Sequence, residues 1–115
     1  MKFSHKRTGD LLTLTLEGDL IGENSGIDLM EVVNTQIADG ARKCIVDIRK
    51  LRYINSSGIG VLITILTKFR NKGGDICLLE PSENVKKLLI ITKLNAIFQV
   101  ALNREDAIKI LSEQA

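Results

Sequence analysis

The sequence predicts an α/β fold, with a mixed β-sheet of about five strands and about four α-helices packed against it. Residues 11–17 alternate leucine with threonine, which is the period-two pattern of a half-buried strand. Residues 43–48 are a short β-branched run, typical of a strand that is covered on both faces, and residues 76–79 are the next predicted strand. Segments with the apolar spacing of helices separate these runs, so strands and helices alternate after an initial pair of strands.

The first two strands are expected at residues 2–6 and 11–17, with residues 8–10 as the turn between them. Gly18 is expected to end the second strand. Two strands joined by so short a turn form a hairpin, and the later strands are connected through helices. The sheet is therefore expected to be mixed.

A first helix is expected over residues 24–38, with Asn24 or Ser25 as its cap and Gly40 as its stop signal. One apolar stripe of this helix should face the sheet. The residues of that stripe are Ile27, Met30, Val33 and Ile37.

The middle of the chain continues the alternation. A buried strand at residues 43–48 leads through a connector at residues 49–55 into a helix over residues 56–71. The glycines at positions 73 and 74 close that helix. Its expected buried residues are Val61, Leu62, Ile65, Leu66 and Phe69.

The last third predicts two shorter helices around a weak strand. After the strand at residues 76–79, a third helix begins at residues 81–82, a weak strand follows at residues 96–101, and Asn103 caps a last helix over residues 105–112. The apolar residues expected inside these helices are Val85, Leu88, Leu89 and Ile91, then Ala107, Ile108 and Leu111.

Composition limits the class of protein. The chain has 115 residues and a net charge of +2, from 16 Lys and Arg against 14 Asp and Glu. Nucleic-acid-binding modules usually carry a much stronger basic excess, and an aromatic content of 3% argues against base-stacking platforms. We therefore expect residues 1–115 to form a single domain with no direct nucleic-acid partner.

Few residues are available for catalysis or for holding a metal. His5 is the only histidine, and Cys44 and Cys77 are far apart in apolar runs, so we expect buried thiols, no metal, no cofactor and no enzyme activity. Glu17 and Asp19 straddle a glycine and are interpreted as a solvated turn rather than an acid/base pair. No signal peptide or membrane-spanning stretch is predicted, which indicates a cytoplasmic protein without a membrane partner.

The start of the second helix is unusual. Ser56 and Ser57 place two hydroxyls there, and Gly58 and Gly60 follow in a position where each glycine costs about 1 kcal/mol relative to alanine. One interpretation is structural: Asn55 or Ser56 caps the helix, and the glycines permit close packing on the sheet. The other is functional: the glycines let another protein approach the hydroxyls, and a phosphate of about −1.5 to −2 charge would then oppose docking.

The segment at residues 55–62, NSSGIGVL, behind the strand at residues 44–48, resembles the signature of STAS domains. More narrowly, it is similar to the bacterial anti-sigma factor antagonists. The resemblance covers nearly the whole chain, including the strand end at residues 16–20, the turn at residues 73–75 and the helical segment at residues 85–89.

This resemblance implies a regulator that switches partners. The unphosphorylated antagonist binds an anti-sigma factor that is also a serine/threonine kinase, the kinase phosphorylates Ser56 (with Ser57 as second choice), and a serine phosphatase reverses the modification. Sigma-factor-dependent transcription is controlled in this way. The partner-binding residues that the resemblance implies are Asp19, Leu20, Ile21, Asn55, Ser56, Ser57, Gly58, Ile59 and Gly60.

Two positions depart from the family pattern. Asn55 stands where the family commonly has Asp, and residues 18–21 read Gly-Asp-Leu-Ile where the family commonly has Gly-Glu-Leu/Ile-Asp. Two carboxylates near the serine are therefore missing. These departures favour an alternative, a STAS scaffold subunit of a transporter or other signalling complex that works without phosphorylation. A small nucleotide-binding enzyme built on residues 57–60 is a further alternative, although no lysine follows the glycines.

Overall fold

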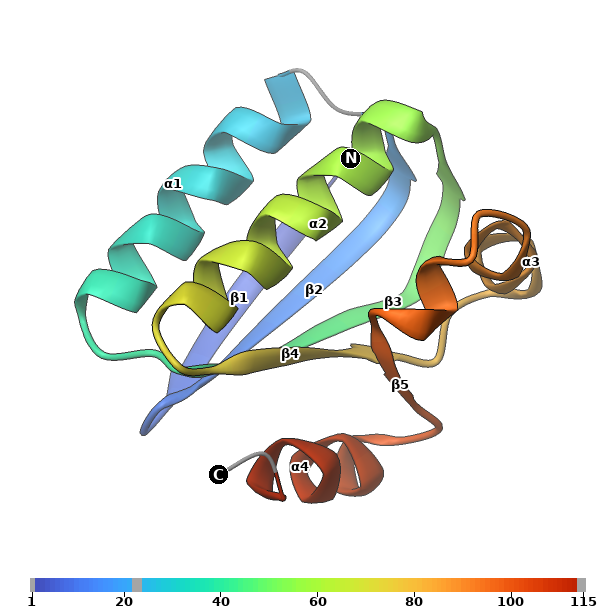
Figure 1. Cartoon of the computed structure of the whole chain (residues 1–115). Coiled ribbons are helices and arrows are strands. Elements are labelled where there is room, and N and C mark those ends of the chain that lie inside the picture. Colours follow the sequence, from blue (N-terminus) through green and yellow to red (C-terminus); the bar gives the residue numbers. More distant parts are fainter. Residues whose placement is uncertain (1, 22–23, 114–115) are drawn as a thin grey trace.

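The computed structural model describes residues 2–21 and 24–113 and contains one mixed sheet with helices on both faces (Figure 1). The sheet has five strands in the order β1-β2-β3-β4-β5. The strands are β1 (Lys2–Thr8), β2 (Leu11–Leu20), β3 (Lys43–Ile54), β4 (Asp75–Leu79) and β5 (Gln99–Ala101). The helices are α1 (Asn24–Ala38), α2 (Ser56–Asn71), α3 (Glu83–Ile91) and α4 (Arg104–Ser112), with a short 3₁₀ helix η1 at Leu94–Ala96.

The pairing of the strands confirms the predicted hairpin and the mixed sheet. Strand β1 runs antiparallel to β2, whereas β2, β3, β4 and β5 run parallel to one another. The carboxyl ends of β2 and β3 therefore lie side by side at one edge of the sheet, and α2 begins directly after β3. In open parallel sheets this edge is where functional sites form.

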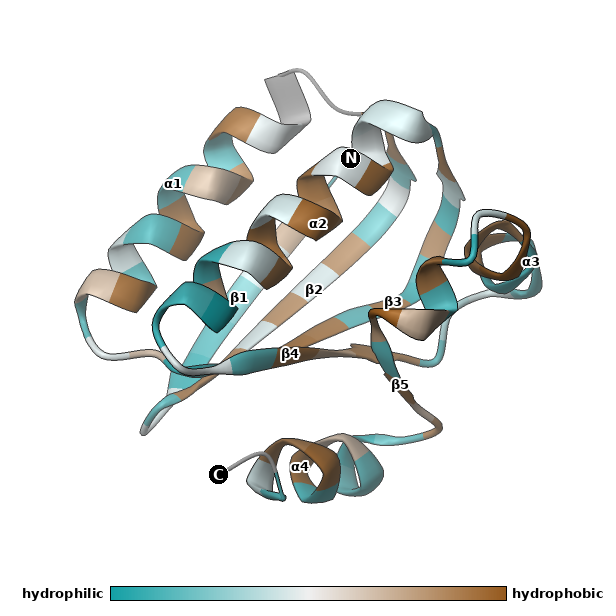
Figure 2. Cartoon of the chain, viewed as in Figure 1, coloured by the Kyte–Doolittle hydropathy of each residue, from teal (hydrophilic) through white to brown (hydrophobic). Residues whose placement is uncertain are grey.

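The two faces of the sheet are covered unequally. Alternate residues of β3 separate the two cores: Val46 and Ile48 pack beneath α1, α2 and α3, whereas Ile45 packs in a smaller core with α4. Figure 1 shows α1 and α2 side by side across one face. Every residue of β4 is buried, which explains the apolar run that Figure 2 shows along this strand. The third predicted strand, at residues 43–48, was correctly interpreted as covered on both faces, because residues 44–48 are all buried.

Strands β2 and β3 continue beyond their expected ends. Gly18 does not end β2, which reaches Leu20, and the expected connector at residues 49–55 is strand up to Ile54. Two register shifts, between Thr15 and Glu17 and between Gly18 and Asp19, each insert an extra residue into β3. The buried residues of this part of β3 are Ile48, Leu51 and Ile54. Burial at every third residue has no period-two pattern, so the sequence did not show a strand here.

Three apolar side chains that were expected in helix cores are exposed. Ile27, Ile91 and Ile108 are 60%, 77% and 40% exposed, and in α1 it is Leu29 that is buried. Met30 and Val61 are half-buried, and the other residues named for the stripes of α1 and α2 are buried. The expected cap at Asn24 or Ser25 involves side chains outside the described part of the structure. The weak strand at residues 96–101 is shorter than expected, since η1 occupies its start.

Within the described residues, no helix is long and apolar enough to cross a membrane. In the same part of the chain, no group of three or more His, Cys, Asp and Glu could hold a metal ion. Cys44 and Cys77 are free and buried, as expected from their apolar runs. Burial raises the pKa of both thiols, in the case of Cys77 to about 11, so neither is poised as a nucleophile.

Candidate functional site

The start of α2 is attached to the end of β2 by Asn55. The Asn55 backbone lies in the extended region, and its Oδ1 accepts a hydrogen bond from the Gly58 N–H at 2.8 Å, which makes Asn55 the N-cap. The Asn55 Nδ2 donates to the Ile21 carbonyl at 3.3 Å, and the Asn55 N–H donates to the Leu20 carbonyl at 3.2 Å. The Asn55 side chain therefore connects the start of α2 with Ile21, directly after β2, and both segments carry residues that the family resemblance implied for partner binding.

Gly58 and Gly60 have different relations to the fold. A Cβ added at Gly58 would lie 2.2 Å from the Leu20 carbonyl oxygen and 2.8 Å from Cγ1 of Ile54, so the contact between α2 and β2 requires glycine. Among the residues that the structure describes, a Cβ added at Gly60 would meet no heavy atom within 4 Å. The structural interpretation of the glycines therefore accounts for Gly58 and leaves Gly60 unexplained.

Ser56 and Ser57 are both exposed and face different surroundings. Ser56 lines a groove of about 560 Å³ between the start of α2 and α3. Ser57 lines a second groove, of about 550 Å³, between α1 and α2. In the described part of the chain neither hydroxyl forms a side-chain hydrogen bond, so both are available to another molecule.

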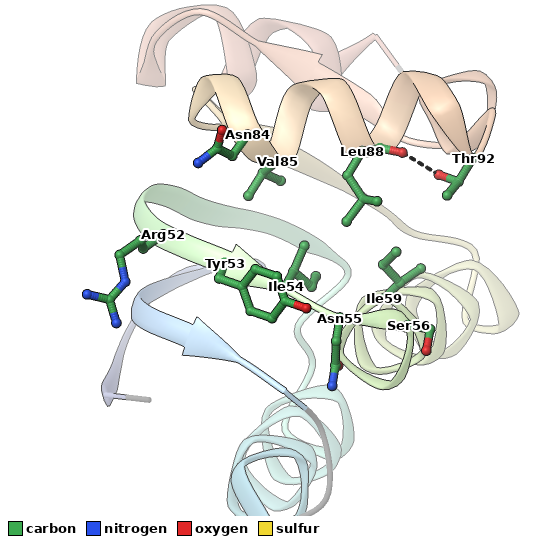
Figure 3. A pocket seen from close by; sticks show the side chains of 10 residues that line it. All are labelled: Arg52, Tyr53, Ile54, Asn55, Ser56, Ile59, Asn84, Val85, Leu88 and Thr92. Carbon is green, nitrogen blue, oxygen red and sulfur yellow. Dashed lines mark hydrogen bonds between the residues drawn. The ribbon is translucent and has the colours of Figure 1, made fainter.

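The groove at Ser56 has an apolar lining. Figure 3 shows Ile59 and Leu88 extending into it from α2 and α3, with Val85 and Ile54 beside them. Tyr53, which is 54% exposed, lies at the end of β3 along the same groove. The lining side chains include no carboxylate. An apolar side chain of another protein would fit this surface, because burying apolar area is favourable and the Arg52 guanidinium in the lining is already paired with Asp19.

The charged residues near the site are paired with each other. The Arg52 guanidinium donates to both carboxylate oxygens of Asp19, at 3.0 and 2.9 Å. This hydrogen-bonded pairing lowers the pKa of Asp19 below its ordinary value. Glu17 lies 3.7 Å from Lys50. The two carboxylates that straddle Gly18 thus pair with different cations, which supports the interpretation that they are not an acid/base pair.

The structure brings most of the predicted site residues to one surface. Ile21 is 51% exposed, and the start of α2 lies beside it, but Leu20 and Gly58 are buried and support the site from beneath. Sequence reasoning missed Tyr53, although an exposed aromatic is informative in a chain with so few of them. Figure 2 shows the start of α2 in near-white, between the hydrophilic and hydrophobic colours. The start of α2 therefore forms a small surface with two exposed hydroxyls, and the ion pair between Asp19 and Arg52 lies near it.

Comparisons with known proteins identify the family to which this fold belongs. Residues 2–107 match the STAS domain family. BtrV of Bordetella bronchiseptica, described as a candidate anti-sigma factor antagonist, is 27% identical over 107 residues, which cover 93% of this chain and 91% of BtrV.

Two solved structures share the fold. A candidate anti-sigma factor antagonist from Thermotoga maritima aligns with a TM-score of 0.85 at 24% identity, covering 96% of this chain and 94% of that one. The anti-sigma factor antagonist SpoIIAA of Bacillus aligns in its unphosphorylated form with a TM-score of 0.82 at 24% identity, covering 97% of both chains. Its phosphorylated form aligns with a TM-score of 0.73 at 24% identity, covering 94% of this chain and 97% of that one. From the family match over residues 2–107 and the five-stranded fold, this chain belongs to the STAS domain family.

Proposed function

We propose that this STAS domain is an anti-sigma factor antagonist. In this proposal the unmodified chain binds an anti-sigma factor that is also a serine kinase, through the start of α2 and the end of β2. Phosphorylation of Ser56 releases the partner, and a serine phosphatase restores binding. The domain itself is not an enzyme, and it acts in the cytoplasm with its partners. The relatives BtrV and SpoIIAA, which are named for this role, support the general function.

The observation that carries the proposal is the environment of Ser56. Ser56 is exposed at the first residue of α2, beside a groove lined by apolar side chains of α2 and α3, and no carboxylate is among the described residues that line this groove. A hydroxyl can be covered by a partner at modest cost if it gains a hydrogen bond. A phosphate adds about −1.5 to −2 charge, and covering a dianion with apolar groups is far more costly. The same position therefore permits docking in one state and opposes it in the other.

The surroundings favour Ser56 over Ser57 as the phosphorylation site. The groove at Ser56 is lined by Arg52 and by no carboxylate, whereas the groove at Ser57 is lined by Glu31 and by no cation. A phosphate on Ser57 would therefore share its groove with a carboxylate of like charge. Since Asn55 caps the helix as Asp would, the first departure from the family pattern leaves the local geometry of α2 intact.

The test compares Ser56→Ala, Ser56→Glu and Ser57→Ala for binding to a purified anti-sigma factor kinase, recovered from the native cell with the Ser56→Ala variant. We expect Ser56→Ala to bind as tightly as the wild type, and Ser56→Glu to bind about tenfold or more weakly. Ser57→Ala is the control, and it should still gain one phosphate from kinase and ATP. Equal affinities of the Ala and Glu variants would refute the switch.

The scaffold alternative predicts a different result. The second departure places Ile21 where the family commonly has Asp, and the lining of the Ser56 groove also lacks a carboxylate. A kinase acting on Ser56 must then supply its own metal ligands. If the intact mass of the chain stays unchanged after incubation with kinase and ATP, while a partner still binds, the scaffold function replaces the switch.

A further inference from the structure

A basic groove lies at the opposite end of α2 from Ser56. It has a volume of about 440 Å³ and lies between the carboxyl ends of α1 and α2, which Figure 1 shows side by side. Figure 2 shows this end of α2 in strongly hydrophilic colours. Three cations line the groove: Arg42, Lys68 and Lys72. The rest of its described lining is neutral and consists of Asn34, Ile37, Ala38 and Asn71.

The three cations of the basic groove have no counter-ion within the described part of the chain. Other cations at this end of the molecule are paired: Arg7 lies 3.5 Å from Asp39, and Arg70 lies 3.3 Å from Asp75. The groove cations form no such pair among the described residues. Two of them, on α2, are four residues apart, a spacing at which like charges destabilise a helix. An anion in the groove would remove this repulsion.

Capping of the helix ends does not account for these charges. Cations near the carboxyl end of a helix commonly compensate for its unpaired carbonyls. At α2, the N–H groups of residues 72–74 already donate to carbonyls of the last turn. At α1, the N–H groups of residues 40 and 41 and the Arg42 guanidinium do the same. Each helix end carries only about half a negative charge, so three cations exceed what two ends can neutralise.

Arg42 is held in place before any ligand arrives. It is half-buried, its N–H donates to the Asp10 carbonyl at 2.9 Å, and its carbonyl accepts from the Asp75 N–H at 3.1 Å. Its Nη1 donates to the carbonyls of Ile37 and Ala41 at 3.0 and 2.7 Å. Its Nε and Nη2 have no hydrogen-bond partner among the described residues. A fixed guanidinium with free donors can bind phosphate oxygens at a small cost in lost conformational freedom.

We propose that the basic groove binds a small soluble anion that carries phosphate groups. The guanidinium and the two ammonium groups would donate charge-assisted hydrogen bonds to phosphate oxygens, and the amides of Asn34 and Asn71 add neutral donors. The volume is within the range of small-molecule sites, about 300–1,000 Å³. None of the exposed large hydrophobic side chains lines the groove, which favours a soluble anion over a membrane surface.

This site is separate from the proposed switch. Lys68 lies about 18 Å from Ser56 along α2, at a rise of about 1.5 Å per residue. Screening in about 0.1 M salt acts over about 10 Å. The charge at Ser56 should therefore leave anion binding unchanged, and the proposal does not depend on the proposed function.

The test is a calorimetric titration of the full chain with sodium pyrophosphate at low ionic strength. We expect saturable binding at one site, and binding about tenfold or more weaker in the double variant Lys68→Gln/Lys72→Gln, which removes two of the three charges. The melting temperature of this variant should stay within about 3 °C of the wild type, because neither lysine side chain forms a hydrogen bond or ion pair among the described residues.

Lys86→Gln/Lys87→Gln is the matched control. Both lysines are exposed on α3, outside the lining of the basic groove, and their removal changes the net charge equally. This variant should bind pyrophosphate within about twofold of the wild type. An equal loss in the two double variants would show attraction by net charge alone and overturn the proposal, as would a titration without saturation.

Two further measurements separate this proposal from its neighbours. Vesicles of phosphatidylglycerol and phosphatidylcholine test the membrane: sedimentation of the chain with them, without saturable pyrophosphate binding, would overturn the soluble ligand. Ser56→Glu should bind pyrophosphate as the wild type does, and Lys68→Gln/Lys72→Gln should bind the kinase as the wild type does. Failure of kinase binding would thus refute the proposed function and leave the anion site standing.

Discussion

The two ends of α2 differ in what their polar groups contact. At the carboxyl end, the N–H groups of Lys72, Gly73 and Gly74 donate to carbonyls of the last turn at 2.9–3.1 Å. Arg70 lies 3.3 Å from the buried Asp75, which also accepts from the N–H of Ile76 at 2.8 Å. At the amino end, Asn55 supplies the cap, while Ser56 and Ser57 remain exposed.

The glycines show the same difference. A Cβ at Gly74 would lie 1.6 Å from the Arg42 carbonyl oxygen, and one at Gly58 would lie 2.2 Å from that of Leu20. Both glycines are required by the close approach of another segment of backbone. Among the described residues, Gly60 has no such neighbour. At the closed end of α2 the polar groups and Gly74 make contacts within the fold, whereas the open end carries two exposed hydroxyls and a glycine that no described contact requires.

The largest expected effect is a loss of stability when a side chain is added at Gly74 or Gly58, the two glycines that lie against another segment of backbone. Gly74→Ala should lower the free energy of unfolding by about 3 kcal/mol or more, and Gly58→Ala by about 2 kcal/mol, because each added methyl would overlap a carbonyl oxygen. Urea unfolding of each variant measures these changes.

The neighbouring Gly73 provides the control for the closed end. It has a φ of +80° and open space at its Cβ position, so Gly73→Ala should cost only about 1 kcal/mol of backbone strain. A loss below 1 kcal/mol in Gly74→Ala would show that the approach to Arg42 relaxes easily. That result would contradict the interpretation that the close approach of the Arg42 carbonyl requires glycine at position 74.

The next effect concerns the cap at the open end. Asn55→Ala should lower the free energy of unfolding by about 1 kcal/mol and weaken kinase binding, because both the N-cap and the bond to the Ile21 carbonyl are lost. Asn55→Asp should stay within about 0.5 kcal/mol of the wild type, since the two residues cap equally well.

Asn103 provides a matched control for Asn55. Its Oδ1 accepts from the Asp106 N–H at 2.8 Å at the start of α4, with the same capping geometry. Asn103→Ala should therefore cost about 1 kcal/mol of stability with unchanged kinase affinity. If Asn103→Ala weakens binding as much as Asn55→Ala does, the effect of Asn55 is general destabilisation and not local order at the site.

The smallest effect is the pH dependence of the ion pair beside the site. Arg52 holds the pKa of Asp19 below its ordinary value of 3.8. A lowered folded pKa means that the pair stabilises the fold above the unfolded pKa, and that this contribution is lost as pH falls through the folded pKa. In Arg52→Gln the pKa of Asp19 should rise toward its ordinary value, and the stability difference from the wild type should shrink on acidification.

An NMR titration of the Asp19 carboxyl, with urea midpoints at about pH 6 and about pH 2, measures both changes. Lys50→Gln, which removes the partner of Glu17, should leave the pKa of Asp19 unchanged. An unchanged pKa in Arg52→Gln would show that the bidentate contact does not persist in solution. Both side chains are partly exposed, so the effect on stability is small.

Local patterns predicted a large part of this molecule. The alternation in residues 11–17 identified β2. The sequence left Asn55 and Ser56 as candidate caps of α2, and the structure shows that Asn55 is the cap. The same reasoning failed in β3, where two bulges spread burial to every third residue, and at Ile27, which is helical but faces outward. Helical periodicity shows that α1 has an apolar face. Whether Ile27 or Leu29 faces the core depends on the elements that pack against the helix, and the structure shows that it is Leu29.

By itself, the sequence determined the order of the elements, the hairpin and the serine-bearing start of α2, because these depend on residues within one turn or strand of each other. Only the tertiary structure decided that a close backbone contact requires Gly58, that no contact among the described residues requires Gly60, and that Ser56 and Ser57 line different grooves. The physical reason is that the Leu20 carbonyl of β2 leaves no room for a side chain at Gly58. Leu20 is more than thirty residues away in the chain and comes close to Gly58 only in the folded structure.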